Sequence, residues 1–154
     1  MNKTRGFTLI EALIVIFMIA FISTIAVPGV MKWRSAAKLR GATENLKGNL
    51  ELAKLKAIQK NGSVSVLFDE NGYQVFVDND KNWDPDSISG VLVTRRLPPG
   101  IKIDLNQGGF GNKDYYGTRF LGRATADSGT VYLENSKGTV KKVIVSSVGR
   151  IRTE

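Results

Sequence analysis

A single carboxylate lies inside a long apolar stretch near the start of the chain. Glu11 is the only charged residue among the 21 residues from Phe7 to Val27. An ionised carboxylate inside a hydrocarbon layer costs a few kcal/mol, and a buried one without a cation is strongly destabilising. We therefore expect Glu11 to form an ion pair. The alternative is that its side chain reaches the membrane surface from one helical turn inside.

A second group of residues has the spacing of oxygen ligands in a calcium loop. Carboxylate and amide side chains alternate at four positions: Asp78, Asp80, Asn82 and Asp84. An EF-hand would need glycine at the sixth place and glutamate at the twelfth, where this chain has Trp83 and Ser89. The mismatch favours a solvated acidic loop over residues 78–86, with Trp83 lying on the surface. Whether Asp78–Asp86 binds calcium stays open.

The end of the chain is basic and could contact phosphates. In the sequence Gly149–Arg150–Ile151–Arg152, alternation along a strand would place both arginines on one face. Residues 29–154 hold 20 basic and 13 acidic side chains, a net charge of +7, which suits nucleic acid. Weaker candidates for the same patch are Lys141 and Lys142, then Lys137, Arg119 and Arg123. Basic ends are also common on soluble domains, so ordinary surface is the alternative.

The composition argues against an enzyme. The chain has no cysteine and no histidine, so the commonest general bases, nucleophiles and transition-metal ligands are missing. It also excludes a disulfide. We expect no cofactor, no metal site and no catalytic residues.

The apolar stretch has the length of a membrane-spanning helix. A helix of 21 residues extends about 31 Å, which matches the hydrocarbon thickness of a bilayer. A secretory signal peptide fits less well, because its apolar region is shorter and a small-residue cleavage site follows it. Pro28 follows the stretch and, because it lacks a backbone donor, favours a kink or an interruption of the helix there.

The rest of the chain predicts one further helical stretch and then strands. Spacings of three and four residues predict an apolar helix face that packs against a sheet: Ala36, Leu39, Ala42, Leu46, Leu50, Ala53 and Ala57. Asn61–Gly62 predicts the helix end. Alternation and turn residues predict two hairpins, over residues 63–77 and 130–145, and strands at 91–95, 101–105 and 148–152, with a glycine-rich loop at 108–117. A long N-terminal helix on an antiparallel sheet domain is an α+β fold.

The sequence GFTLIEALIVIFMIAFISTIAVP, residues 6–28, resembles the class III signal of type IV pilins and type II secretion pseudopilins. The resemblance implies that prepilin peptidase cleaves between Gly6 and Phe7 and that Phe7 becomes N-methylated. It also implies that Glu11 pairs with the terminal amine of a neighbouring subunit, a head-to-tail contact that propagates into a filament. Proline is frequent in pilins at the place of Pro28, where the helix leaves the membrane.

Four later segments, residues 52–61, 120–123, 129–133 and 143–152, resemble the FimT/GspH group of minor pilins and minor pseudopilins. The implied partners are other pilins or pseudopilins, prepilin peptidase and an inner-membrane assembly platform. The basic ending resembles that of FimT-like pilins that bind double-stranded DNA in natural transformation, with Gly149, Arg150 and Arg152 as the implied site. The alternative is a GspH-like type II secretion pseudopilin with no nucleic-acid role.

The resemblance also implies an organisation and a location. We expect a cleaved leader at residues 1–6, a transmembrane and filament-core helix at 7–28, an amphipathic helix at 29–61 and a periplasmic β-rich domain at 62–154. Four basic residues within 32–40, against two before the stretch, would by themselves place the C-terminal side in the cytoplasm. The resemblance implies the opposite, a single pass through the bacterial inner membrane with a periplasmic C-terminal domain.

Overall fold

The helix α1 (Leu9–Lys60) begins the described part of this computed structural model, which covers residues 7–85, 90–110 and 115–154. The side chains of residues 27 and 28 are also outside the description. The chain divides into two compact units, Met1–Arg34 and Ser35–Glu154. Each is described separately below.

The first unit contains the apolar part of α1. Thr8 caps the start of the helix, because the backbone N–H of Glu11 donates to Thr8 Oγ1 at 3.3 Å. The large apolar side chains that follow are exposed, Leu9 at 84% of its surface. By length and composition, α1 includes one stretch that could cross a membrane. These side chains therefore need lipid or other helices to cover them.

The helix is not interrupted at Pro28. Helical backbone continues from Leu9 to Lys60. Of the two effects expected of Pro28, a kink or an interruption, the interruption does not occur. Proline cannot donate a hydrogen bond to the carbonyl of Thr24, four residues earlier. The loss of a single bond is compatible with a helix when the turns on both sides remain hydrogen-bonded.

The second unit buries the predicted apolar face of α1. Six of its seven residues are at most 3% exposed: Leu39, Ala42, Leu46, Leu50, Ala53 and Ala57. Ala36 is exposed, because it lies only one residue inside the start of this unit, before the buried stripe begins. Thr43 is buried instead, and its hydroxyl donates to the carbonyl of Leu39 at 2.8 Å. A threonine can join an apolar face when its hydroxyl bonds to the preceding turn.

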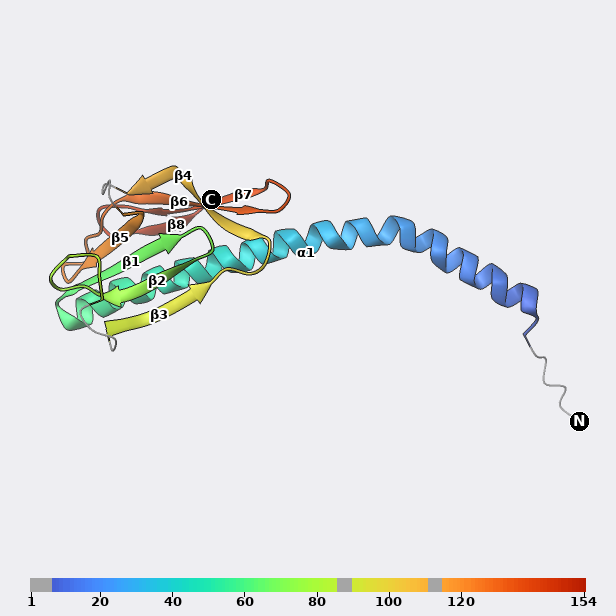
Figure 1. Cartoon of the computed structure of the whole chain (residues 1–154), viewed down its shortest axis with the longest axis horizontal. Helices are drawn as coiled ribbons and strands as arrows, with labels where there is room; N and C mark the ends of the chain where they lie inside the picture. The colour runs from blue at the N-terminus through green and yellow to red at the C-terminus, as the bar shows by residue number, and fades with distance from the viewer. Residues whose placement is uncertain (1–6, 86–89, 111–114) are drawn as a thin grey trace, which may run out of the picture. The chain divides into compact units, whose positions relative to one another are not determined.

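Two antiparallel sheets of four strands follow the helix (Figure 1). The first has the order β3-β2-β1-β5, with bounds β1 (Ser63–Asp69), β2 (Gly72–Val77), β3 (Val91–Arg96) and β5 (Gly117–Leu121). The second has the order β4-β6-β7-β8, with bounds β4 (Ile101–Phe110), β6 (Gly129–Asn135), β7 (Val140–Val145) and β8 (Ile151–Thr153). Both predicted hairpins, β1–β2 and β6–β7, are confirmed.

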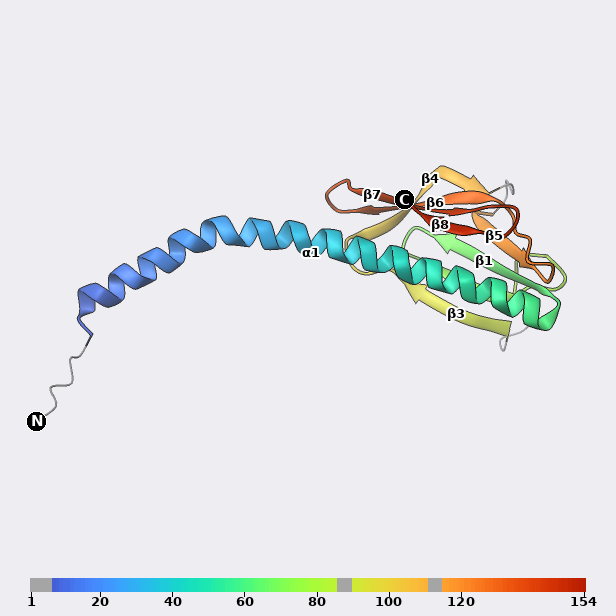
Figure 2. The ribbon, with the colours of Figure 1, turned by 180° about the vertical axis from the view of Figure 1, so that it is seen from behind.

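One core joins the helix to the inner faces of both sheets. From α1 it includes Leu46 and Leu50, from the first sheet Val66 and Phe120, and from the second sheet Val131. Figure 2 shows the second half of α1 lying across the strands of this unit. All of the buried core side chains belong to residues 39–145. A fragment of residues 29–154 therefore contains all of the core that the structure describes.

The structure corrects three details of the predicted strands. The glycine-rich segment is not entirely a loop, because β4 continues to Phe110, which pairs with Gly129. Gly108 and Gly109 have positive φ values of 76° and 117° at an irregularity in this pairing, which glycine accommodates. Strand β5 was not predicted, and it pairs with β1. Strand β8 starts only at Ile151.

Candidate functional site

The start of α1 exposes the residues implicated in processing and assembly. Phe7 is 77% exposed, and Glu11 lies on the first turn of the helix. Gly6, and with it the predicted cleavage bond, lies outside the described residues. Within the part of the chain that the structure describes, Glu11 has no ion pair. Its carboxylate is therefore available to a cation from another molecule.

The C-terminal turn that carries Gly149 is built by specific contacts. Gly149 has a φ of +66°, and an added Cβ would collide with the carbonyl oxygen of Ala124. Its own carbonyl accepts a hydrogen bond from Lys54 Nζ at 2.9 Å, which ties the turn to α1. Ser146 Oγ accepts from the backbone N–H of Arg150 at 3.0 Å. These contacts explain a glycine here without any ligand.

The basic tail does not form the continuous strand face that the sequence predicts. Arg150 precedes β8, and only Arg152 lies within it, although both side chains are exposed. Arg152 stands opposite Ile144 of β7. The predicted strand 148–152 begins too early, because Arg150 lies in the turn before β8, where the backbone N–H of Ser146 donates to its carbonyl oxygen at 2.9 Å.

The weaker basic candidates are distributed over different surfaces. Lys142 forms an ion pair with Glu154 at 2.7 Å, and this partner raises the pKa of the lysine. Side chains alternate between the two faces of a strand, so Lys141 lies on the same face of β7 as the buried Val143. Lys142 lies on the other face. Only Lys142 shares a face with Arg152, and Glu154 partly neutralises it.

Asp78 and Arg119 form a buried ion pair on the outer side of the first sheet. Asp78 is fully buried, and its Oδ2 accepts from Arg119 Nη2 at 2.8 Å and from the Ser65 hydroxyl. Burial alone raises the pKa of this carboxyl, but the hydrogen bonds from Ser65 and Arg119 and the charge of Arg119 outweigh it, so the pKa lies below its usual value. The Arg119 guanidinium also lies 4.3 Å from the centre of the Trp83 ring. Arg119 is thus not available for a basic patch.

The other members of the acidic segment bond within their own loop. Asn82 Nδ2 donates to Asp80 Oδ2 at 2.8 Å, and the backbone N–H of Asp84 donates to Asn82 Oδ1 at 2.7 Å. Asp80 and Asp84 are exposed, as expected of a solvated loop, whereas the buried Asp78 departs from that prediction. Among the described residues no group of three or more carboxylates could hold a metal. Asp86 and Ser89 lie outside the described residues.

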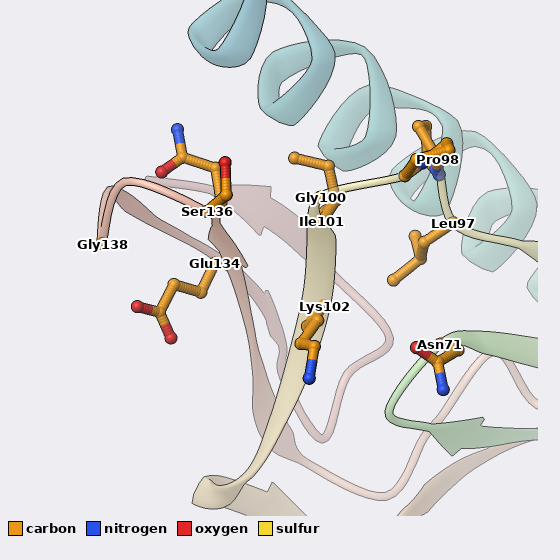
Figure 3. Close-up of a pocket in the computed structure, with 11 residues that line it drawn as sticks. Asn71, Leu97, Pro98, Gly100, Ile101, Lys102, Glu134, Ser136 and Gly138 are labelled. Carbon is orange, nitrogen blue, oxygen red and sulfur yellow. The ribbon is translucent and has the colours of Figure 1, made fainter.

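A cavity of about 380 Å³ lies between the connection from β3 to β4 and the turn from β6 to β7 (Figure 3). Its walls include Leu97 and Pro98 on one side and Glu134 and Ser136 on the other. Lys102 is the cation among the lining residues of this cavity, and it already forms an ion pair with Glu70. The lining offers neither histidine nor cysteine to act as a nucleophile or base at neutral pH.

A long N-terminal helix packed on antiparallel sheets, with one carboxylate in an apolar first half, defines a pilin-like protein. Residues 42–149 match the family model described as type II transport protein GspH, and residues 1–27 match the prokaryotic N-terminal methylation motif. The chain belongs to the GspH family of minor pilins and pseudopilins, which are structural subunits that assemble with others in filaments.

Solved structures show the same fold. The minor pseudopilin EpsH of the type 2 secretion system of Vibrio cholerae superposes with a TM-score of 0.60 at 15% identity, over 76% of this chain and 96% of that one. The type IV minor pilin FimU of Pseudomonas aeruginosa superposes with a TM-score of 0.59 at 16% identity, over 79% of this chain and 92% of that one. A comparison with curated protein sequences gives no significant match.

Proposed function

We propose that this protein is a minor structural subunit of a type IV pilus or a type II secretion filament. Prepilin peptidase would cleave between Gly6 and Phe7 and methylate Phe7, and an inner-membrane platform would then assemble the subunit. The match to the methylation motif over residues 1–27 supports the processing step. The family is structural, and we propose no enzymatic activity and no cofactor.

The observation that carries this proposal is the lone carboxylate of Glu11 on an exposed apolar helix. Its own chain gives it no ion pair within the described residues. The new amine at Phe7 of a neighbouring subunit would neutralise it, and each subunit would in turn offer its own amine to the next. Residues 7–28 would form the membrane and filament-core helix, with residues 29–61 and 62–154 in the periplasm. Pro28 would mark the end of the membrane segment.

The experiment is to replace Glu11 by alanine and to measure both membrane level and filament content. We expect Glu11→Ala to accumulate in the inner membrane and to be absent from sheared filaments. Glu44→Ala, an exposed carboxylate on the same helix outside the apolar stretch, is the matched control and should assemble normally. Normal incorporation of Glu11→Ala would refute the pairing.

A second proposal concerns double-stranded DNA at the exposed Arg150 and Arg152, as in a minor pilin for natural transformation. The net charge of +7 over residues 29–154 supports it. The alternative is a type II secretion pseudopilin without nucleic-acid binding. Fragment 29–154 is titrated with duplex DNA at several salt concentrations, beside a double Arg150→Ala, Arg152→Ala variant. The control is Arg96→Ala, an exposed cation on β3 of the other sheet.

Each lost phosphate contact should lower the slope of log K against log salt by about 0.9. The DNA proposal holds if the double variant, and not the control, binds DNA more weakly and with a smaller dependence of log K on log salt. Gly149 would then be a positioning residue and Lys142 a weaker contributor beside Arg152. Lys141 faces the other side of its sheet, so its replacement should matter less. If the wild-type fragment does not bind at low salt, the DNA proposal fails and the secretion pseudopilin is the better assignment.

A further inference from the structure

A polar recess lies where α1 ends, next to the connection from β5 to β6. It encloses about 670 Å³ and is lined by Asn61, Gly62, Ser63, Asn79, Lys81, Leu121, Gly122, Arg123 and Thr125. Of these residues, Arg123 alone is considered above for a function, as a weaker candidate for the basic patch. We propose that the recess binds a carboxylate side chain presented by a partner protein.

The charges of the lining favour an anion. Lys81 and Arg123 are the two ionisable residues that line the recess, and both are cations. Both side chains are exposed, and neither forms an ion pair among the residues that the structure describes. Arg123 therefore differs from Arg119, whose charge is already neutralised by the ion pair with Asp78. Two unpaired cations around one concavity attract a negative group more strongly than either does alone.

A buried hydroxyl adds a hydrogen-bond donor. Ser63 lines the recess, is only 4% exposed, and its Oγ has no hydrogen-bond partner among the described residues. Leaving a buried polar group unpaired costs free energy, so such groups are rare in folded proteins. By contrast, Ser65, two residues along the same strand, is bonded to Asp78. Asp78, whose backbone N–H donates to the Ser63 carbonyl at 3.0 Å, carries the other buried oxygen without a partner among the described residues, Oδ1. This carboxylate and a ligand oxygen are therefore the two acceptors that compete for the Ser63 hydroxyl.

The backbone around the recess is held in an unusual conformation. Asn61, Lys81 and Ala124 are not glycines, yet they have positive φ values of 45°, 61° and 65°. Two of them line the recess, and Ala124 lies between two lining residues. An added Cβ at Gly122 would stand 2.9 Å from the Asn61 backbone, so this glycine allows two of the walls to approach closely. Asn61 follows the last residue of α1, where a left-handed residue is ordinary. Lys81 and Ala124 have no such explanation, and sparsely populated conformations of this kind are frequent near binding sites.

The shape favours a single carboxylate over duplex DNA. Phosphates of a duplex are read by cations spread along an exposed surface. Here two cations, one hydroxyl and the amide of Asn61 surround one concavity, an arrangement that suits an aspartate or glutamate side chain. Asn79 also lines it, but its side-chain oxygen accepts from the backbone N–H of Ser63 at 3.2 Å. Because neither Glu11 nor Arg152 takes part, this site can fail without affecting the filament or DNA proposals.

The test uses the full ¹⁵N-labelled chain in nonionic detergent micelles, followed by NMR at constant ionic strength. The probe is an end-capped tripeptide with a central glutamate, and the same tripeptide with glutamine is the ligand control. We expect saturable shifts of the Ser63 and Gly122 backbone N–H signals with the glutamate peptide only. A Lys81→Gln, Arg123→Gln double variant should weaken binding about tenfold or more.

Two controls separate a specific site from general charge attraction. An Arg96→Gln, Lys137→Gln double variant removes the same charge from exposed positions elsewhere and should leave the affinity within a factor of two. Ser63→Ala should weaken binding without lowering the unfolding temperature, because it removes an unpaired hydroxyl. The proposal is overturned by non-saturating shifts, by equal losses in both double variants, or by tighter binding of a short DNA duplex than of the peptide at this recess.

Discussion

Replacing Arg119 by methionine should destabilise the second unit strongly. The change keeps an unbranched apolar stem as far as the position of Nε but removes the guanidinium from a carboxylate, Asp78, that is fully buried. Two guanidinium contacts to Asp78 Oδ2 are lost, at 2.8 and 3.2 Å, together with the contact to the Trp83 ring. Removing one partner of a buried ion pair costs about 3–5 kcal/mol. We expect a loss in that range at pH 7, measured by urea unfolding of fragment 29–154.

The pH dependence distinguishes the ion pair from simple packing. In the wild type the lowered pKa of Asp78 contributes stability above the ordinary pKa of the carboxyl, and this contribution is lost as the pH falls through the folded-state pKa. In Arg119→Met, burial dominates and should raise the pKa of Asp78. The difference in unfolding free energy between the two proteins should therefore shrink as the pH is lowered and the carboxyl becomes protonated.

Arg123→Met is the matched control, because Arg123 is exposed and forms no ion pair within the described residues. Its effect on the unfolding free energy should stay within about 0.5 kcal/mol. The reasoning is refuted if Arg119→Met costs less than about 1 kcal/mol, or if its cost does not decrease in acid.

Two further predictions concern the same fragment. Gly149→Ala should lower the unfolding free energy by about 1–3 kcal/mol, because the new side chain combines a left-handed φ with a collision at Ala124. Gly48 lies on a helix surface with nothing near its Cβ, so Gly48→Ala should raise the unfolding free energy by up to about 1 kcal/mol. Urea unfolding that ranks the two variants alike would contradict this. Burial raises the pKa of Tyr116 to about 12. The ultraviolet titration of Tyr116→Phe should therefore show one late-ionising phenol fewer than that of the wild type. The stability that the Tyr116 phenol contributes should be present below pH 10 and lost as the pH rises through about 12. A titration in which all tyrosines ionise near pH 10 would refute the second prediction.

Much of the fold could be predicted because its signals are local. The apolar spacing of α1 identified six buried residues, and Asn61–Gly62 marked the helix end, where Asn61 adopts the left-handed conformation. Alternation and turn residues identified both hairpins. Periodicities of 3.6 and 2 depend only on neighbours within a few residues, so a single sequence displays them directly. The same is true of the signal around Gly6 and Glu11, because its length, apolarity and single charge are contiguous.

What the sequence could not show depends on contacts between distant residues. Asp78 resembled a calcium ligand until the fold placed it beside Arg119, 41 positions away. Gly149 resembled part of a binding motif until the fold placed it against Ala124 and Lys54. The recess gathers Ser63, Lys81 and Arg123 from three separate segments. Whether a charged side chain is free to bind depends on burial and on its partners, and only the packing of the two sheets on α1 determines these.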